Sequence, residues 1–240
     1  MDENIHVFIE NVEASQSFGA LKDACISHFL AIGGKMMSYH HIPPFGAEDH
    51  GAELTVIAHG FPEDWVQRYR GERLYRDDPI PRYALQTAKP FWWSDATDFP
   101  SLTKRERRYL KVLEEAKLGD GLALPVYGPN GRDGYASLGF GLTRPELSAV
   151  AMRRVQWACQ VAHERYCQLL CDETKERVTL SPREQEILSW VARGKSNSVI
   201  AQIIGISANT VDTYMRRIYA KLHVVDRVTA ALRAVAIGAL

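Results

Sequence analysis

The stretch 180–222 constrains the fold more than any other part of the chain, because its pattern predicts three short amphipathic helices with separate start and stop signals. The first begins with the capping-box sequence Ser-Pro-Arg-Glu at 181–184 and ends at Gly194. The second ends at Gly205, and the third begins after Ser207. Because helices of this length are unstable alone, their apolar faces must pack together. The stretch therefore predicts a small helical bundle of the helix-turn-helix type.

The third of these helices has a polar outer face that suits contact with DNA. Short amide and hydroxyl side chains near its start can reach base edges, and cations further along can contact phosphate or guanine. The candidate DNA-binding residues are Asn209, Thr210, Asp212, Thr213, Arg216, Arg217 and Lys221. Periodicity alone leaves a second interpretation open, in which this is the solvated charged face of an ordinary three-helix bundle.

Charge is divided unevenly between the two ends of the chain. The formal net charge is zero, which by itself argues against a nucleic-acid binder. Residues 175–240, however, contain ten Lys or Arg against five Asp or Glu, and residues 1–174 contain nineteen against twenty-four. The C-terminal part thus carries about +5 and the remainder about −5, which fits attraction of phosphate by one domain only.

The residues before this bundle predict a separate domain of mixed helices and strands. We expect two helices at the start, the second ending near Gly33, and then extended runs at 36–42 and 53–59 that form a hairpin. Asn130-Gly131 marks the turn of a second hairpin. The remaining predicted elements are helices at 61–69, 78–88, 101–118 and 145–170, and strands at 91–93, 121–127 and 134–141.

This order of elements predicts an α+β protein of two domains. Five strands with helices before, between and after them indicate an α-β-α sandwich around a five-stranded, mostly antiparallel sheet. An all-α, four-helix helix-turn-helix domain follows. The predicted domains are 1–171 and 179–240, and the polar stretch 172–178 is the predicted linker.

Four residues of the first domain form a second constellation. Trp65 and Tyr69 share one helical face, Asp78 opens the next predicted helix, and Trp93 lies on the predicted strand after it. A carboxylate among amphipathic aromatic side chains suits a small ligand with an amide or a lactone, because the acid accepts from an N–H group and the ring faces pack on apolar parts. The alternative is a sheet-packing core in which Asp78 only caps a helix.

The helical bundle contains the sequences LSPREQEIL at 180–188, GKSN at 194–197, IA at 200–201, IS at 206–207, TV at 210–211 and KL at 221–222. With these residues it resembles, to the end of the chain, the C-terminal DNA-binding domain of LuxR-type transcription factors. Two positions depart from the common pattern of that family: Asp212 stands where a basic residue is frequent, and Tyr214 where a histidine is frequent. A carboxylate there can accept from a cytosine amino group, so a different preferred operator is expected.

The first domain also resembles that family, at the residues Trp65, Tyr69, Asp78-Pro79, Trp93 and Gly121. Their intervals match those of the domain that binds acyl-homoserine lactones in LuxR-type receptors. The resemblance implies that Asp78 bonds the amide N–H of the ligand and that Trp65 bonds its lactone carbonyl. It implies that Tyr69 and Trp93 form walls of the pocket.

Two further positions complete the ligand site that the resemblance implies. Ser137 matches a Ser or Thr that bonds the amide carbonyl. Phe61 stands where relatives often have a tyrosine that assists this contact. Loss of that hydroxyl favours an unsubstituted or unusual acyl group.

The resemblance implies a ligand-responsive bacterial transcriptional regulator that controls quorum-sensing genes. The implied ligand is an N-acyl-homoserine lactone as autoinducer, without a cofactor or metal. The implied partners are a double-stranded, two-fold related DNA operator, RNA polymerase, and a second copy of the chain that pairs through the helix near 145–170. A regulator of the same fold that responds to a different small molecule, or to none, is the alternative.

The sequence disfavours other classes of protein. It has no Gly-x-Ser-x-Gly, Walker loop or His-x-x-x-His pair, so an enzyme such as a lactonase is not expected. The two predicted hairpins do not fit the alternating α/β receiver of a phosphorylation-driven regulator. The four cysteines lack metal-ligand spacing and are expected to be reduced thiols. With no run of eighteen apolar residues and no basic signal-peptide start, the protein is expected in the cytoplasm.

Overall fold

The computed structural model describes residues 2–47, 56–173 and 179–240. The chain divides into two compact units. The larger contains a sheet with helices, and the smaller contains helices alone. Within the described ranges, every helix is too short or too polar to cross a membrane.

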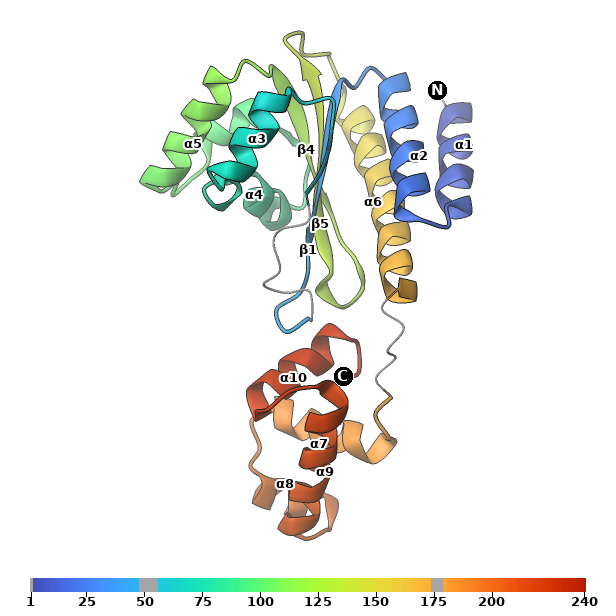
Figure 1. Cartoon of the computed structure of the whole chain (residues 1–240), viewed down its shortest axis with the longest axis vertical. Helices are drawn as coiled ribbons and strands as arrows, with labels where there is room; N and C mark the ends of the chain where they lie inside the picture. Colours follow the sequence, from blue (N-terminus) through green and yellow to red (C-terminus); the bar gives the residue numbers. More distant parts are fainter. Residues whose placement is uncertain (1, 48–55, 174–178) are drawn as a thin grey trace. The chain divides into compact units, whose positions relative to one another are not determined.

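The larger unit is organised around a five-stranded sheet in the order β2-β1-β5-β4-β3, in which all neighbouring strands are antiparallel (Figure 1). The strands are β1 (Met36–Ile42), β2 (Val56–His59), β3 (Phe91–Trp92), β4 (Asp120–Val126) and β5 (Asp133–Gly141). Both predicted hairpin pairings are present, although residues 53–55 of the predicted second strand lie outside the described residues. Asn130 and Gly131 have φ values of 57° and 76°, a left-handed conformation that Asn and Gly tolerate best.

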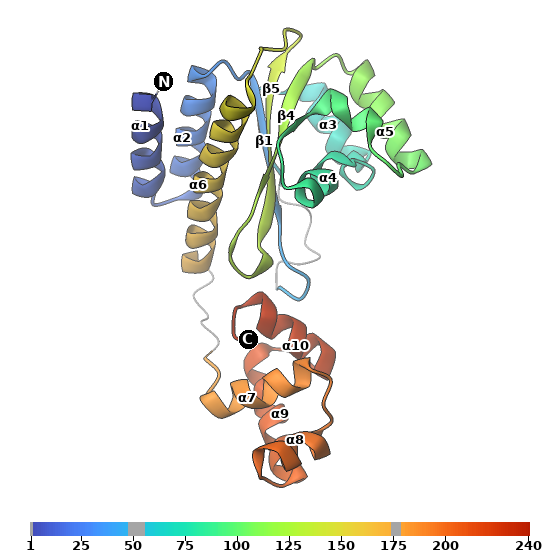
Figure 2. The same ribbon diagram turned by 180° about the vertical axis from the view of Figure 1, so that it is seen from behind.

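Helices cover both faces of the sheet, as Figures 1 and 2 show from opposite sides. One layer contains α1 (Asp2–Ala14), α2 (Phe18–Ala31) and α6 (Ala149–Glu173), and the other contains α3 (Glu63–Gly71), α4 (Ile80–Thr87) and α5 (Lys104–Glu115). Strand side chains alternate between two cores: Leu122 and Leu138 pack with the first layer, Ala123 and Tyr135 with the second. The predicted α-β-α sandwich is confirmed.

Trp93 does not continue the third strand, so the predicted strand at 91–93 is one residue too long. β3 ends at Trp92, and Trp93 begins a 3₁₀ helix, η2 (Trp93–Asp98). The carboxylate of Asp95 accepts a hydrogen bond from the Trp92 N–H at 3.0 Å and caps this turn. Trp92 packs in the core that contains α6, and Trp93 packs in the core on the opposite face, as expected of neighbouring residues at the end of a strand.

Two helices start later than predicted because a side chain caps each of them. α5 begins after Thr103, whose hydroxyl accepts from the N–H of Glu106 at 3.2 Å while the Glu106 carboxylate accepts from the N–H of Thr103 at 2.7 Å. α6 begins after Ser148, whose hydroxyl accepts from the N–H of Ala151 at 3.1 Å. At its other end α6 extends into the predicted linker, of which residues 174–178 lie outside the described residues.

Within residues 179–240 the smaller unit has four α-helices, which confirms the predicted all-α, four-helix domain. The helices are α7 (Pro182–Ala192), α8 (Asn197–Ile204), α9 (Ala208–Leu222) and α10 (Arg227–Ala236). Each begins at a residue whose side chain accepts from a backbone N–H of the first turn: Ser181, Ser196, Ser207 and Asp226. Their shared core includes the fully buried Ile187, Leu188, Ile200, Val211 and Ile218. The bundle is therefore specified by local caps and by one apolar centre together.

Candidate ligand pocket and nucleic-acid interface

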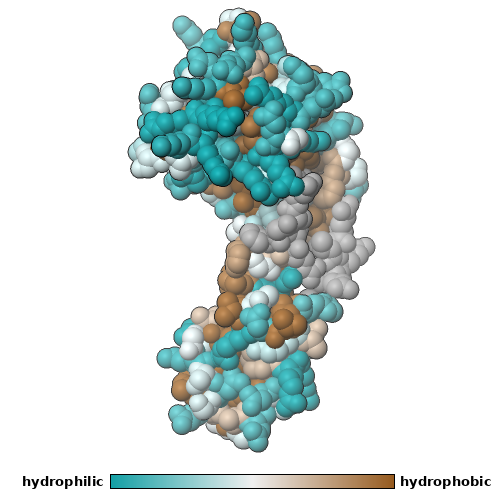
Figure 3. Space-filling view, turned by 60° about the vertical axis from the view of Figure 1, so that its left-hand side comes forward, coloured by the Kyte–Doolittle hydropathy of each residue, from teal (hydrophilic) through white to brown (hydrophobic). Residues whose placement is uncertain are grey.

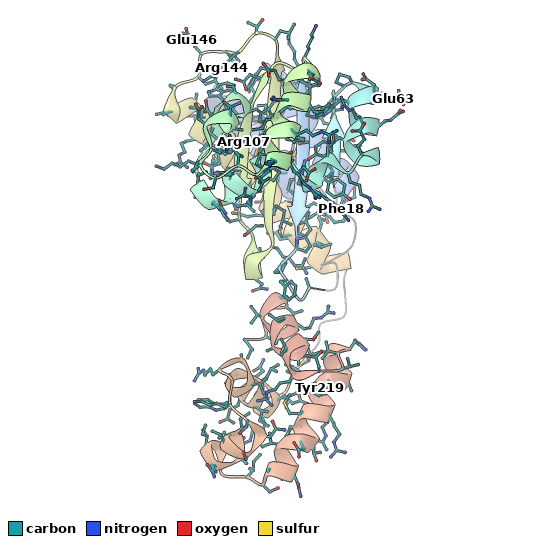
Figure 4. The ribbon with its side chains drawn as sticks, turned by 90° about the vertical axis from the view of Figure 1, so that its left-hand side faces the viewer. Phe18, Glu63, Arg107, Arg144, Glu146 and Tyr219 are labelled. Carbon is teal, nitrogen blue, oxygen red and sulfur yellow. The ribbon has the colours of Figure 1, made fainter. Side chains whose placement is uncertain are left out.

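A pocket lies between the sheet and the layer of α3, α4 and α5. It contains about 560 Å³ of space free of protein atoms, part of it open to solvent. Six of the seven residues predicted to bind a ligand line it: Phe61, Trp65, Tyr69, Asp78, Trp93 and Ser137. The outer surface of this layer is largely hydrophilic (Figure 3), and Glu63 and Arg107 lie on that outside (Figure 4). The aromatic side chains that line the pocket thus lie on the inner side of this layer.

The carboxylate of Asp78 is fixed from three sides. Its Oδ2 atom accepts hydrogen bonds from the hydroxyl groups of Tyr69 at 3.0 Å and Tyr109 at 2.9 Å, and its Oδ1 atom accepts from the N–H of Ile80 at 2.9 Å. The residue keeps some surface exposure, but protein atoms surround the carboxylate, and this burial raises the pKa of Asp78 to about 6 despite the three donors. Asp78 therefore caps α4, as the alternative interpretation required, and also holds a carboxylate at the pocket.

A line of polar side chains crosses the sheet face of the pocket. Ser38 on β1 and Ser137 on β5 are register partners, and their hydroxyl groups lie 2.7 Å apart. His40, two residues further along β1, has its Nε2 atom 3.4 Å from the Ser38 hydroxyl. Burial lowers the pKa of His40 to about 4, so the imidazole is neutral at neutral pH.

Sequence reasoning missed other residues that line the pocket, among them Ser38, His40, Tyr109 and Tyr135. Sequence reasoning could have found the first two. Side chains two apart on a strand face the same way, so the predicted strand at 36–42 places Ser38 and His40 on one face. Tyr109 lies on the helix predicted at 101–118, but nothing in the local pattern shows that it reaches Asp78 from thirty-one positions away.

Gly121 is the one predicted ligand residue that does not line the pocket. A Cβ atom at this position would lie 2.6 Å from Cζ2 of Trp93, closer than real Cβ contacts allow. A Cβ atom at Gly139, on the neighbouring strand, would lie 2.9 Å from the same ring. The two glycines thus make room for the indole of Trp93, which forms a wall of the pocket.

All seven residues predicted to contact DNA are exposed on α9, and six of them form no ion pair with a described residue: Asn209, Thr210, Asp212, Thr213, Arg216 and Arg217. Lys221 differs. Its ammonium group lies 2.7 Å from the carboxylate of Glu184 and 3.2 Å from the carbonyl of Thr179. Burial of Glu184 opposes ionisation, but the hydrogen bonds from Lys221 and Ser181 prevail and lower its pKa. Lys221 therefore joins α9 to the start of α7.

Asp212 also takes part in a contact between helices. Its carboxylate accepts a hydrogen bond from the side-chain amide of Asn197, at the start of α8. The amide oxygen of Asn197 accepts in turn from the guanidinium of Arg227 at 2.7 Å, at the start of α10. The carboxylate that departs from the common pattern thus joins the starts of two helices to α9.

Comparison with known protein families gives two matches along the chain. Residues 18–166 match the family model described as "Autoinducer binding domain". Residues 178–234 match the one described as "Bacterial regulatory proteins, luxR family". The chain belongs to the LuxR family. It is a LuxR-type quorum-sensing transcriptional regulator with an autoinducer-binding domain and a helix-turn-helix DNA-binding domain, as the resemblance implied.

Individual LuxR-family relatives agree with this assignment. The chain is 33% identical over 186 residues to the HTH-type quorum sensing-dependent transcriptional regulator RpaR of Rhodopseudomonas palustris, covering 78% of this chain and 75% of that one. The crystal structure of Escherichia coli SdiA superposes with a TM-score of 0.73 at 19% identity, covering 98% and 96% of the two chains. SdiA in complex with octanoyl-rac-glycerol gives 0.72 at 18% identity, covering 97% and 93%. The SdiA likeness shows a shared fold.

Proposed function

We propose that this regulator binds an N-acyl-homoserine lactone between the sheet and helices α3 to α5, and that it controls quorum-sensing genes by binding a two-fold related operator as a homodimer. The observation that carries the ligand is the carboxylate of Asp78. Tyr69 and Tyr109 occupy its Oδ2 atom, whereas Oδ1 accepts one bond, from Ile80, and has capacity for a second. A ligand amide N–H is the complementary donor.

The polar contacts of the ligand are proposed as follows. Asp78 accepts from the amide N–H, and the Ser137 hydroxyl donates to the amide carbonyl while it accepts from Ser38, its partner at 2.7 Å. The indole N–H of Trp65 donates to the lactone carbonyl. Each of these groups lines the pocket, so one small molecule can satisfy them together.

The apolar contacts come from the aromatic walls. Tyr69 and Trp93 pack on the faces of the ligand, and Phe61, which stacks near Trp93 with ring centroids 6.3 Å apart, closes the same side without a hydroxyl group. Gly121 contributes by the space that it leaves to Trp93. Packing of a ligand against these rings removes apolar surface from water, and so the bound ligand stabilises the folded domain.

Helix α6 is the proposed dimerisation surface. Val150 and Trp157 are seven residues apart and therefore share a helical face, and they are 64% and 51% exposed. Large apolar side chains at this exposure are typical of a surface that a partner covers. A two-fold dimer would bring two copies of α9 to successive major grooves. Within this proposal the domains are 1–171 for ligand and dimer and 179–240 for DNA, joined by 172–178.

The proposed DNA contacts are the exposed polar residues of α9. Asn209, Thr210, Asp212 and Thr213 lie in the first turns, where base edges are read, and Arg216 and Arg217 follow where phosphate is contacted. Lys221 lies beyond them on the same helix, and its ion pair with Glu184 competes with phosphate for the same charge.

A different ligand with the same fold is the second candidate. SdiA has been solved with octanoyl-rac-glycerol, an ester without an amide N–H. Such a ligand would leave the free capacity of Asp78 without an amide donor, although a glycerol hydroxyl could donate there instead. The two chemistries are therefore separated by which small molecule the protein retains.

Expression with a panel of acyl-homoserine lactones and octanoyl-glycerol, followed by mass spectrometry of the purified protein, tests the proposal. We expect a lactone to be retained, and we expect Asp78→Asn and Trp65→Phe each to lower its retention about tenfold, the value of one good hydrogen bond. Asp77→Asn and Trp92→Phe are matched controls, because Asp77 does not line the pocket and Trp92 packs on the opposite face of the sheet. Retention of the glycerol ester alone would contradict the lactone assignment.

A further inference from the structure

His40 carries a buried polar atom that the described protein leaves unsatisfied. The residue is 3% exposed and lines the pocket. Its Nε2 atom lies near the Ser38 hydroxyl, but its Nδ1 atom has no hydrogen-bond partner among the described residues. An unpaired buried polar atom is unfavourable, and in a pocket the polar group of a ligand can satisfy it.

The position of His40 in the pocket follows from the strand register. Along β5, Gly139, Ser137 and Tyr135 lie on one face of the sheet in steps of about 7 Å, and the last two line the pocket. Trp93 packs on Gly139 at one end, and the pair of Ser38 and Ser137 lies in the middle. His40 is the register partner of Tyr135, and their rings meet edge to face at 5.1 Å. His40 therefore lies at the other end of the row, and the Tyr135 side chain reaches from there toward Ser137 and Trp93.

Helix α3 and the residues just before it repeat this order. Phe61, which precedes the helix, contacts Trp93 at the first end, with ring centroids 6.3 Å apart. Tyr69 contacts His40 at the other end, at 6.2 Å. Trp65 lies between them in the sequence, four residues from each, and lines the same pocket. The pocket is thus elongated, and aromatic rings lie at both of its ends.

The unpaired atoms orient a ligand in this row. At the first end, the indole Nε1 of Trp93 is buried, with the Tyr135 side chain near it but outside hydrogen-bond geometry. That end suits the lactone ring, which has two oxygen acceptors. With the amide held at the serines and Asp78, the acyl arm points toward His40. This orientation rests on the proposed function.

We propose that His40 is a specificity-determining residue, which limits the acyl arm to a few carbons and which selects an arm that carries a hydroxyl or keto oxygen. A neutral imidazole has one donor and one acceptor nitrogen, so it can bond either type of oxygen. A long, unsubstituted arm meets the His40 ring where the arm needs space. Such an arm also leaves the Nδ1 atom of His40 unpaired. Phe61 lacks the hydroxyl group that a tyrosine would offer to the ligand. His40 thus supplies a polar contact from the sheet side of the pocket.

Competition for the full-length protein tests this inference. Cells that express it are supplied with equal amounts of β-hydroxybutanoyl-, butanoyl- and dodecanoyl-homoserine lactone, and the lactones retained after purification are quantified by mass spectrometry. We expect the hydroxylated short lactone to exceed the unsubstituted one about tenfold, as one hydrogen bond allows, and to exceed the long one by more. Equal retention of the two short lactones, or a preference for dodecanoyl, would overturn the inference.

Variants separate the hydrogen bond from the bulk of the ring. His40→Leu is expected to abolish the preference for the hydroxylated lactone, His40→Asn to keep part of it, and His40→Ala to increase the share of the dodecanoyl lactone. His41→Leu is the matched control, because His41 is equally buried but faces Tyr166 on the other side of the sheet. If His40→Leu retains the wild-type ratio, His40 does not determine specificity. If the wild type retains no lactone at all, the proposed function fails and not this inference alone.

Discussion

At the scale of single residues, the carboxylate of Asp78 is placed at a cost to stability. Burial raises its pKa from 3.8 to about 6, although three donors favour the charged form. The unfolded chain ionises at the ordinary value, so the folded state binds the proton more tightly. The stabilising effect of protonation is present below about pH 4 and is lost as the pH rises through about 6. The ionised carboxylate of Asp78, which can accept from a ligand amide N–H, therefore destabilises the ligand-free protein at neutral pH.

Asp78→Asn tests this linkage. Relative to the wild type, the free energy of unfolding of the ligand-free variant should improve by up to about 3 kcal/mol between about pH 4 and pH 8, because two pKa units correspond to that energy. Urea denaturation at both pH values measures the difference. Asp77→Asn is the neighbouring control. A difference between variant and wild type that stays constant with pH would show that Asp78 ionises in the folded state as it does in the unfolded chain.

Gly121→Ala tests the fit of Trp93. The added Cβ would lie within 2.7 Å of three indole atoms, so the ring must move into the pocket. We expect a loss of about 1–3 kcal/mol in unfolding free energy, the usual cost of overpacking, and weaker ligand retention. Gly71→Ala, where a Cβ meets nothing within 4 Å, is the control. Ligand retention and stability equal to the wild type would mean that the indole has room elsewhere.

The site was predictable from sequence only as far as local patterns reach. Six of the seven proposed ligand residues line one pocket, because motif intervals along helix and strand fix their faces. Tyr109 and Tyr135 join them through tertiary packing, which no spacing in the sequence reveals. Lys221 likewise falls on the polar face of its helix by periodicity, yet its partner Glu184 is thirty-seven positions away.

At the scale of elements, helix ends decide where the predicted and observed structures differ. The helices of the smaller unit have explicit caps, and the predicted starts at Ser181 and Ser207 agree with the structure. The strand predicted at 91–93 is one residue too long because Asp95 caps a turn within an apolar run. Hydrophobic pattern alone extends such a run, and a single side-chain hydrogen bond ends it.

The salt dependence of DNA binding distinguishes the cations of α9. Arg216→Ala and Arg217→Ala should each reduce the slope of log K against log salt concentration by about 0.9, the value for one phosphate contact. Lys221→Ala should leave the slope nearly unchanged and instead lower the stability of the smaller unit, because it removes the partner of Glu184. Fluorescence anisotropy with operator DNA at several salt concentrations measures the slopes. A slope reduced by the same amount in Lys221→Ala would show that Lys221 contacts phosphate.

At the scale of the whole molecule, the dimer proposal concerns the exposed face of α6. Trp157→Glu should convert the ligand-bound dimer to a monomer and weaken operator binding by at least tenfold, because a charge would be buried against an apolar partner surface. Sedimentation velocity measures the assembly state. Val7→Glu on α1 is the control, since Val7 is also 51% exposed. A dimer that persists in Trp157→Glu would place the interface elsewhere.

The consecutive tryptophans of η2 and β3 have one more consequence. Trp92 and Trp93 contribute to opposite cores, one with the helix proposed for pairing and one with the chamber proposed for the messenger. The shortest covalent route between these two compartments is therefore a single peptide bond. Two fluorophores of the same kind sit at its ends, so variants that keep only Trp92 or only Trp93 of the five tryptophans would give each compartment its own optical probe.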